Sequence, residues 1–101
     1  MKARQYRLSH VPRVAQQIRD LSKRAAELGI SHWLKDTFNL IVEKLQTVPL
    51  QIGDPYGHPK KAGSVIRVAI VEPVSFRYVV YKREKVVLWL EVKPLSRFFP
   101  E

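Results

Sequence analysis

The residues that could act on a phosphate are the arginines and a few proton carriers in the second half of the chain. Cleavage of RNA by its own 2′-hydroxyl needs a base, an acid and cations that stabilise the charged phosphorane. Arginine supplies such a cation, because its planar guanidinium binds phosphate oxygens in pairs. The acid and base candidates are Tyr81, Glu91, His58 and Tyr56. These residue types predict phosphate binding and leave the proton carrier open.

One of these candidates, His58, lies in a basic segment next to Lys60 and Lys61. If this segment folds over a basic sheet, the imidazole and both ammonium groups reach a phosphate; the alternative is a solvent-exposed histidine and simply solvated lysines. The other two histidines lie near expected helix starts. With three dispersed histidines and no cysteine, we expect no metal site. No phosphate loop or other cofactor motif is present, so no cofactor is expected.

The charge of the chain indicates an anionic partner. Lysine and arginine total 18 against 9 aspartates and glutamates, a net charge of +9 on 101 residues. RNA, DNA, the ribosome or an acidic protein would match this excess, and a merely soluble basic surface is the alternative. No apolar run reaches the roughly 20 residues that span a bilayer, and no secretory signal is expected, so a cytoplasmic protein is the default. The length predicts one domain over residues 1–101.

Two helices are expected in the first half of the chain. A short strand over residues 4–9 precedes an apolar stripe with spacings of three and four, which predicts a helix capped by Ser9 and ended by Gly29. Ser31 is placed to cap a second helix, and Pro49 stops it. Because a glycine and a cap separate the two helices, they should form an antiparallel hairpin.

Strands dominate the second half. Residues 49–64 form a loop by their proline and glycine content, and residues 93–101 form a tail. Between them, short links and β-branched residues predict an antiparallel meander of Val65–Val71, Val74–Lys82 and Lys85–Val92. The order is β-α-α-β-β-β, an α+β fold whose helix hairpin packs on one face of a mainly antiparallel four-stranded sheet.

Alternation along the meander predicts an apolar face against the helices and a second, polar face. The apolar face is expected to contain Ile66, Val68, Ile70, Phe76, Tyr78, Val80, Val86, Leu88 and Leu90. The opposite face is expected to contain Arg67, Arg77, Tyr81, Trp89 and Glu91. If the two turns centre on Glu72 and Arg83, Arg77 lies across from Arg67 on one side and Trp89 on the other.

This register predicts a binding row of Arg67, Arg77 and Trp89. Like charges directly opposed on a sheet are unfavourable unless an anion neutralises them, and an arginine beside an indole suits the stacking of a base. The row is flanked by Lys60, Lys61 and Arg97. The alternative is a solvated face in which Glu91 pairs with an arginine and Trp89 covers aliphatic carbons.

The segment Arg67–Tyr81 leads from a strand with a basic residue into Phe76-Arg77-Tyr78-Val79-Val80-Tyr81, and Lys85–Val92 follows as an apolar strand. Upstream, Leu45–Pro55 places leucine, proline and glycine after the expected hairpin. In these features, and in element order over essentially the whole chain, the sequence resembles the RelE/ParE toxin superfamily.

The resemblance implies a toxin of a type II toxin–antitoxin pair, neutralised by an antitoxin segment that wraps it. In the RelE branch the toxin cuts messenger RNA in the ribosomal A site, and in the ParE branch it poisons DNA gyrase. By this likeness Arg77 matches the strand arginine that holds substrate phosphate, and Arg67 matches the basic residue of the preceding strand. In RelE nucleases a basic, arginine-containing stretch and then a Tyr or His follow the last strand. Here Arg97 can stand in for the basic residue, but no terminal Tyr or His follows it, so the tail departs from that pattern.

Three hypotheses follow. The first is a RelE-like toxin that binds RNA or the ribosome and cleaves messenger RNA. Its catalytic candidates are Arg77, His58, Tyr81 and Glu91, and its binding candidates are Arg67, Arg77, Arg97, Lys60, Lys61 and Trp89. The second is a ParE-like inhibitor of gyrase or another protein, or a degenerate RelE-fold binding protein. The third is a nucleic-acid-binding module outside toxin biology. An antitoxin is the expected partner of a toxin, and Phe98 and Phe99 leave a homodimer open.

Overall fold

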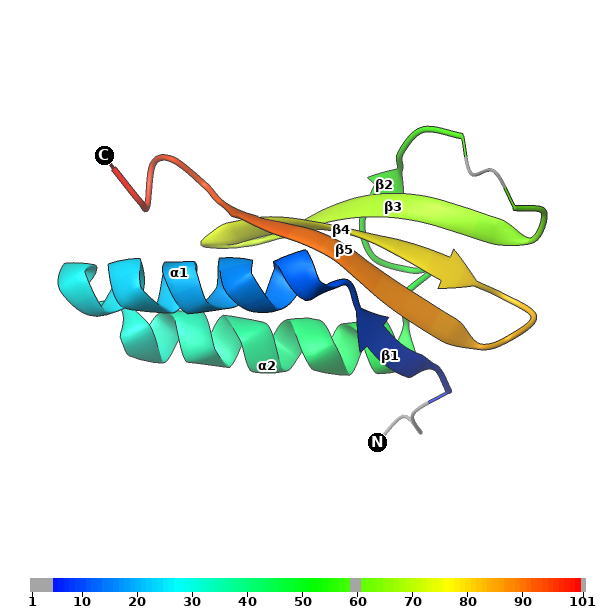
Figure 1. Cartoon of the computed structure of the whole chain (residues 1–101), viewed down its shortest axis with the longest axis horizontal. Coiled ribbons are helices and arrows are strands. Elements are labelled where there is room, and N and C mark those ends of the chain that lie inside the picture. The colour runs from blue at the N-terminus through cyan, green and yellow to red at the C-terminus, as the bar shows by residue number, and fades with distance from the viewer. Residues whose placement is uncertain (1–4, 59–60, 101) are drawn as a thin grey trace.

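The computed structural model describes residues 5–58 and 61–100, in which two helices pack on one side of a five-stranded sheet (Figure 1). The elements follow in the order β1 (Arg7–His10), α1 (Pro12–Leu28), α2 (Ser31–Thr47), β2 (Asp54–Pro55), β3 (Ser64–Val71), β4 (Val74–Tyr81) and β5 (Val86–Pro94). The strand order is β1-β5-β4-β3-β2, with β1 parallel to β5 and the other pairs antiparallel. The predicted α+β architecture is confirmed, and the two-residue strand β2 adds a fifth strand.

The helix hairpin forms as predicted, but neither predicted serine cap exists. Val11 is the N-cap of α1, because Ser9 belongs to β1, where it pairs with Leu88. Pro12 suits the first turn, since its fixed φ is already helical. Ser31 is the first residue of α2 and not its cap. No helix within the described ranges is long and apolar enough to cross a membrane.

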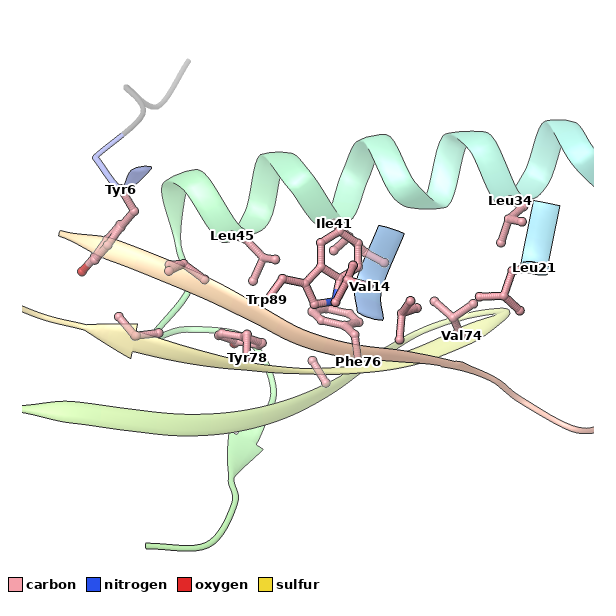
Figure 2. Close-up of a cluster of buried hydrophobic side chains, with 14 of the residues drawn as sticks. Tyr6, Val14, Leu21, Leu34, Ile41, Leu45, Val74, Phe76, Tyr78 and Trp89 are labelled. Carbon is pink, nitrogen blue, oxygen red and sulfur yellow. The ribbon is translucent and has the colours of Figure 1, made fainter. Parts of the chain in front are cut away.

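The core lies between the helix hairpin and the sheet (Figure 2). From the helices it takes the fully buried side chains of Val14, Leu21, Ala25, Leu34, Ile41 and Leu45. From β4 and β5 it takes Val74, Phe76, Tyr78, Val80, Val87, Trp89 and Val92. The face predicted for Phe76, Tyr78 and Val80 is therefore confirmed, since these residues alternate inward along β4.

The faces of β3 are the reverse of those predicted. The turn between β3 and β4 has two residues, Glu72 and Pro73, so Arg67 pairs with Tyr78 and Val68 pairs with Arg77. Because side chains alternate with a period of two, this one-residue difference moves every β3 side chain to the other face. Arg67 lies on the helix side, and the predicted opposition of Arg67 and Arg77 is wrong.

A bulge at Leu90 sets the faces of β5. Tyr78 pairs with Trp89 while the preceding Arg77 pairs with Glu91, which leaves Leu90 without an opposite residue. Trp89 and Val92 therefore both face the core, and Glu91 faces the other side. The Trp89 Nε1 donates a hydrogen bond of 3.0 Å to the Glu91 carbonyl oxygen. The predicted pairing of Arg77 with Trp89 is wrong for this reason.

Tyr78 and Arg67 fasten the loop after α2 to the sheet, and we call this set of contacts the clamp. The Tyr78 hydroxyl donates toward the carbonyl oxygens of Pro49 at 2.7 Å and Ile52 at 3.0 Å. The Arg67 Nε donates to the Ile52 oxygen at 2.8 Å, and its Nη2 donates to the Gly53 oxygen at 2.6 Å. Arg67 tolerates the helix side of the sheet because these carbonyls satisfy its donors.

Gly53 is the point where the clamped loop crosses onto β3. Its φ is 70°, and an added Cβ would lie 2.4 Å from the carbonyl oxygen of Val68 and 2.9 Å from the Cβ of Ala69. A side chain there would clash with backbone as well as strain the left-handed conformation. The start of β2 therefore depends on glycine at this position.

The clamp predicts a loss of stability at alkaline pH. Burial raises the pKa of Tyr78 to about 12 from 10.0, although the nearby Arg67 lowers it. Below pH 10 both states keep the phenol proton, so its contribution is fully present; above pH 10 only the unfolded chain ionises readily, and stability falls as pH rises. Tyr78→Phe should lower the free energy of unfolding by about 1–2 kcal/mol at pH 8. Between pH 8 and pH 11 this free energy should then fall about 1.4 kcal/mol less in the variant than in the parent. Urea unfolding from pH 8 to 11 measures this, and parallel declines in both proteins would contradict it.

Candidate functional site

The face of the sheet away from the helices carries the candidate site, and we call it the open face. From β3 and β4 it takes Ile66, Val68, Ile70, Ser75, Arg77, Val79 and Tyr81, and from β5 it takes Leu88, Glu91 and Lys93. No helix in residues 5–58 and 61–100 covers it (Figure 1). Ile70 is 64% exposed there, so the open face combines apolar surface with a small group of charges.

Arg77 lies in a hollow of about 200 Å³ on the open face. Its guanidinium carbon lies 5.3 Å from the ring centroid of Tyr56. Its Nη2 lies 3.7 Å from the Glu91 Oε2, and the Lys93 Nζ lies 3.6 Å from the Glu91 Oε1. Ser75 also lines this space, which we call the Arg77 hollow.

The positive charges of the Arg77 hollow are only partly balanced. Two cations share the single carboxylate of Glu91. The 3.7 Å separation from Arg77 is an ion pair but exceeds hydrogen-bond length. The Arg77 Nε is buried and has no hydrogen-bond partner among the described residues. Leaving this buried donor without an acceptor is unfavourable. The Arg77 side chain as a whole is 28% exposed, so an anion would approach its outer nitrogens, of which Nη2 meets Glu91 only at ion-pair distance.

Of the predicted site residues, the structure brings together Arg77 and Glu91. Arg67 lies on the helix side and is held by the clamp. Trp89 is only 4% exposed, because its ring packs edge to face against Phe38 and Phe76. Figure 2 shows it next to Phe76 in the core. The predicted row of Arg67, Arg77 and Trp89 is therefore wrong, and a base cannot stack on this indole.

Tyr81 and Lys61 form a separate pair near the other end of β4. Tyr81 shares the open face with Arg77, but four residues of strand place it about 13 Å away. The Lys61 ammonium lies 5.3 Å from the Tyr81 ring centroid and 3.1 Å from the Glu84 Oε2. These two predicted residues therefore do not converge on the Arg77 hollow.

Arg97 also lies outside the Arg77 hollow. Arg97 pairs with Glu72 of the β3–β4 turn and lies over the ring of Phe98 at 4.7 Å. Phe98 contacts Trp33 edge to face, and Phe99 is buried, so these rings attach the tail to the helices.

His58 does not line the Arg77 hollow. His58 is exposed and makes no side-chain hydrogen bond or ion pair with the described residues. Lys60 lies outside the described residues. Within the described ranges no three histidine or acidic side chains are grouped so that they could hold a metal ion.

Lys93 and Tyr56 were not predicted to lie beside Arg77. Lys93 follows Glu91 by two residues on one strand, so its place on the same face could have been read from alternation had the strand been extended past Val92. Tyr56 was considered only as a proton carrier. Its place beside Arg77 depends on β2, which is too short to leave a pattern in the sequence.

Solved structures with a similar fold are known. A chain of the archaeal RelE–RelB complex from Pyrococcus horikoshii OT3 matches with a TM-score of 0.63 at 19% identity, covering 92% of this chain and 98% of that one. A chain of the chromosomal ParDE toxin–antitoxin system from P. aeruginosa matches with a TM-score of 0.63 at 15% identity, covering 92% and 99%. No family model and no curated protein sequence matches. The chain has the RelE/ParE toxin fold.

The shared carboxylate predicts a specific response to charge removal. Glu91→Gln should raise affinity for inorganic polyphosphate about two- to fivefold, because the anion no longer competes with Glu91 for Arg77 and Lys93. Competition binding at fixed ionic strength measures the change. Glu84→Gln removes the same charge beside Lys61 and is the matched control, with a smaller rise expected. Equal rises in both variants would contradict a role for the Arg77 hollow.

Proposed function

We propose that this chain is a toxin of a type II toxin–antitoxin pair, of the RelE kind, and that the Arg77 hollow holds a phosphate of RNA. The observation that carries the proposal is the Arg77 guanidinium on the open face, whose side chain is 28% exposed and which shares the single Glu91 carboxylate with Lys93. The RelE/ParE fold supports the toxin class. The net charge of +9 supports an anionic substrate. Such a toxin acts in the cytoplasm, on messenger RNA at the ribosome.

Phosphate binding in the Arg77 hollow is an exchange of anions. Arg77 now meets Glu91 at ion-pair distance, and Lys93 meets the same carboxylate. A phosphate oxygen would take the place of one carboxylate oxygen and also accept from the Arg77 guanidinium, whose fork suits two oxygens at once. Glu91 stays beside the phosphate, held by Lys93.

The same residues suit cleavage of the strand. The Glu91 carboxylate accepts the proton of the 2′-hydroxyl as that oxygen bonds to phosphorus, and the bond from phosphorus to the 5′-oxygen breaks. Arg77 stabilises the charge of the phosphorane. The Lys93 ammonium donates a proton to the departing 5′-oxygen. The products are a 2′,3′-cyclic phosphate and a 5′-hydroxyl, and the reaction requires no metal ion.

A second candidate is an inhibitor that binds a protein target without cutting RNA. It is favoured by the apolar part of the open face, where Ile70 is 64% exposed next to the half-buried Val68, and the half-buried Ile66 and Leu88 lie farther along the same face. Exposed apolar surface rimmed by charge is typical of protein contacts. In this case the target is gyrase or another protein. An antitoxin protein is the expected partner of either toxin.

Induced expression distinguishes the two candidates. The chain should arrest growth and produce codon-phased cuts in translated messages, measured by primer extension. Arg77→Ala should lower cleavage by about 10²- to 10³-fold, the usual loss when a transition-state donor is removed. Arg13→Ala removes an equal charge from the exposed start of α1 and should keep wild-type cleavage.

The other outcomes are equally informative. Growth arrest with gyrase-linked DNA breaks and intact messages would establish the second candidate. If the wild-type chain causes neither growth arrest nor RNA cleavage, the proposal that it is a toxin is overturned.

A further inference from the structure

Tyr56 holds an exposed aromatic ring at a defined place on the open face. β2 pairs Asp54 with Val68, and the Tyr56 N–H donates to the Ile66 carbonyl oxygen at 2.8 Å. In this register Tyr56 lies on the same side as Ile66 and Val68, which is the open side. The residue is nevertheless 48% exposed, so the ring is held by the sheet without being buried in it.

The clamp pre-organises this position from the other side of the sheet. Arg67 and Tyr78 hold the carbonyls of Pro49, Ile52 and Gly53, which immediately precede β2. Tyr56 therefore follows a segment with four side-chain hydrogen bonds to the sheet. A ring placed in this way loses little conformational entropy when a ligand stacks on it.

Neither core packing nor hydrogen bonding accounts for the Tyr56 ring. Its hydroxyl makes no hydrogen bond within residues 5–58 and 61–100. Its ring meets the Arg77 guanidinium in a cation–π contact, with the guanidinium carbon 5.3 Å from the ring centroid. An exposed ring beside an arginine that can hold phosphate is the combination that binds single-stranded nucleic acid, where a base stacks and the backbone meets the cation.

We propose that Tyr56 is a base-stacking residue, which takes an unstacked base of single-stranded RNA while Arg77 and Lys93 hold its phosphate. This inference rests on the proposed RNA-binding function. Duplex RNA does not fit, because its bases are already stacked on one another. Stacking needs only a π-face, so the Tyr56 hydroxyl is dispensable and any base is accepted.

The test compares two probes of equal length on the full chain by fluorescence anisotropy. One is a short single-stranded RNA with 2′-O-methyl groups, which cannot be cut, and the other is the same backbone without bases. Tyr56→Leu should weaken binding of the RNA about 5- to 100-fold and leave the abasic probe within about twofold. Tyr56→Phe should bind both probes like the wild type, while Arg77→Ala should weaken both.

Tyr81→Leu is the matched control, since Tyr81 also lies on the open face beside a lysine, about 13 Å along β4. It should leave RNA binding unchanged. Equal weakening of both probes by Tyr56→Leu, or no weakening of either, would overturn the stacking role while the RNA-binding proposal survives. Failure of the wild-type chain to bind either probe would overturn the RNA-binding proposal itself.

Discussion

The bulge at Leu90 decides which side chains of β5 enter the core and which reach the open face. Because it inserts one unpaired residue, Trp89 and Val92 both enter the core and Glu91 emerges beside Arg77. In a regular ladder that keeps the pairing of Tyr78 with Trp89, Glu91 would lie across from Phe76 on the helix side. A carboxylate buried there without a partner is strongly unfavourable. The same bulge thus completes the core and creates the charged group of the open face.

The clamp connects that core to the candidate site. The Tyr78 side chain is fully buried, yet its hydroxyl reaches the loop that starts β2. Arg67 acts on the same loop from β3, and Gly53 lets the chain pass close to Val68. Tyr56 therefore stands beside Arg77 because of residues on the opposite face. An arginine that the family resemblance suggested for phosphate here acts by positioning another segment.

The sequence predicted the parts of the fold that depend on local patterns. Apolar spacing and Gly29 predicted the helix hairpin, and alternation predicted that Phe76, Tyr78 and Val80 face it. The faces of β3 and β5 were not predictable in this way, because β3 has apolar residues on both sides and the bulge interrupts β5. Within the site, Arg77 and Glu91 were identified as candidates, whereas the place of Tyr56 depends on hydrogen bonds made through tertiary structure.

We propose that the open face around Arg77, and not the helix hairpin, binds the anionic ligand. Backbone chemical-shift mapping of the full chain with a short, uncleavable single-stranded RNA tests it most directly. The largest shifts should occur at Tyr56, Ser75, Arg77 and Lys93, with the exposed sides of α1 and α2 unchanged. Shifts concentrated on the exposed helix residues, with those four amides unmoved, would contradict it.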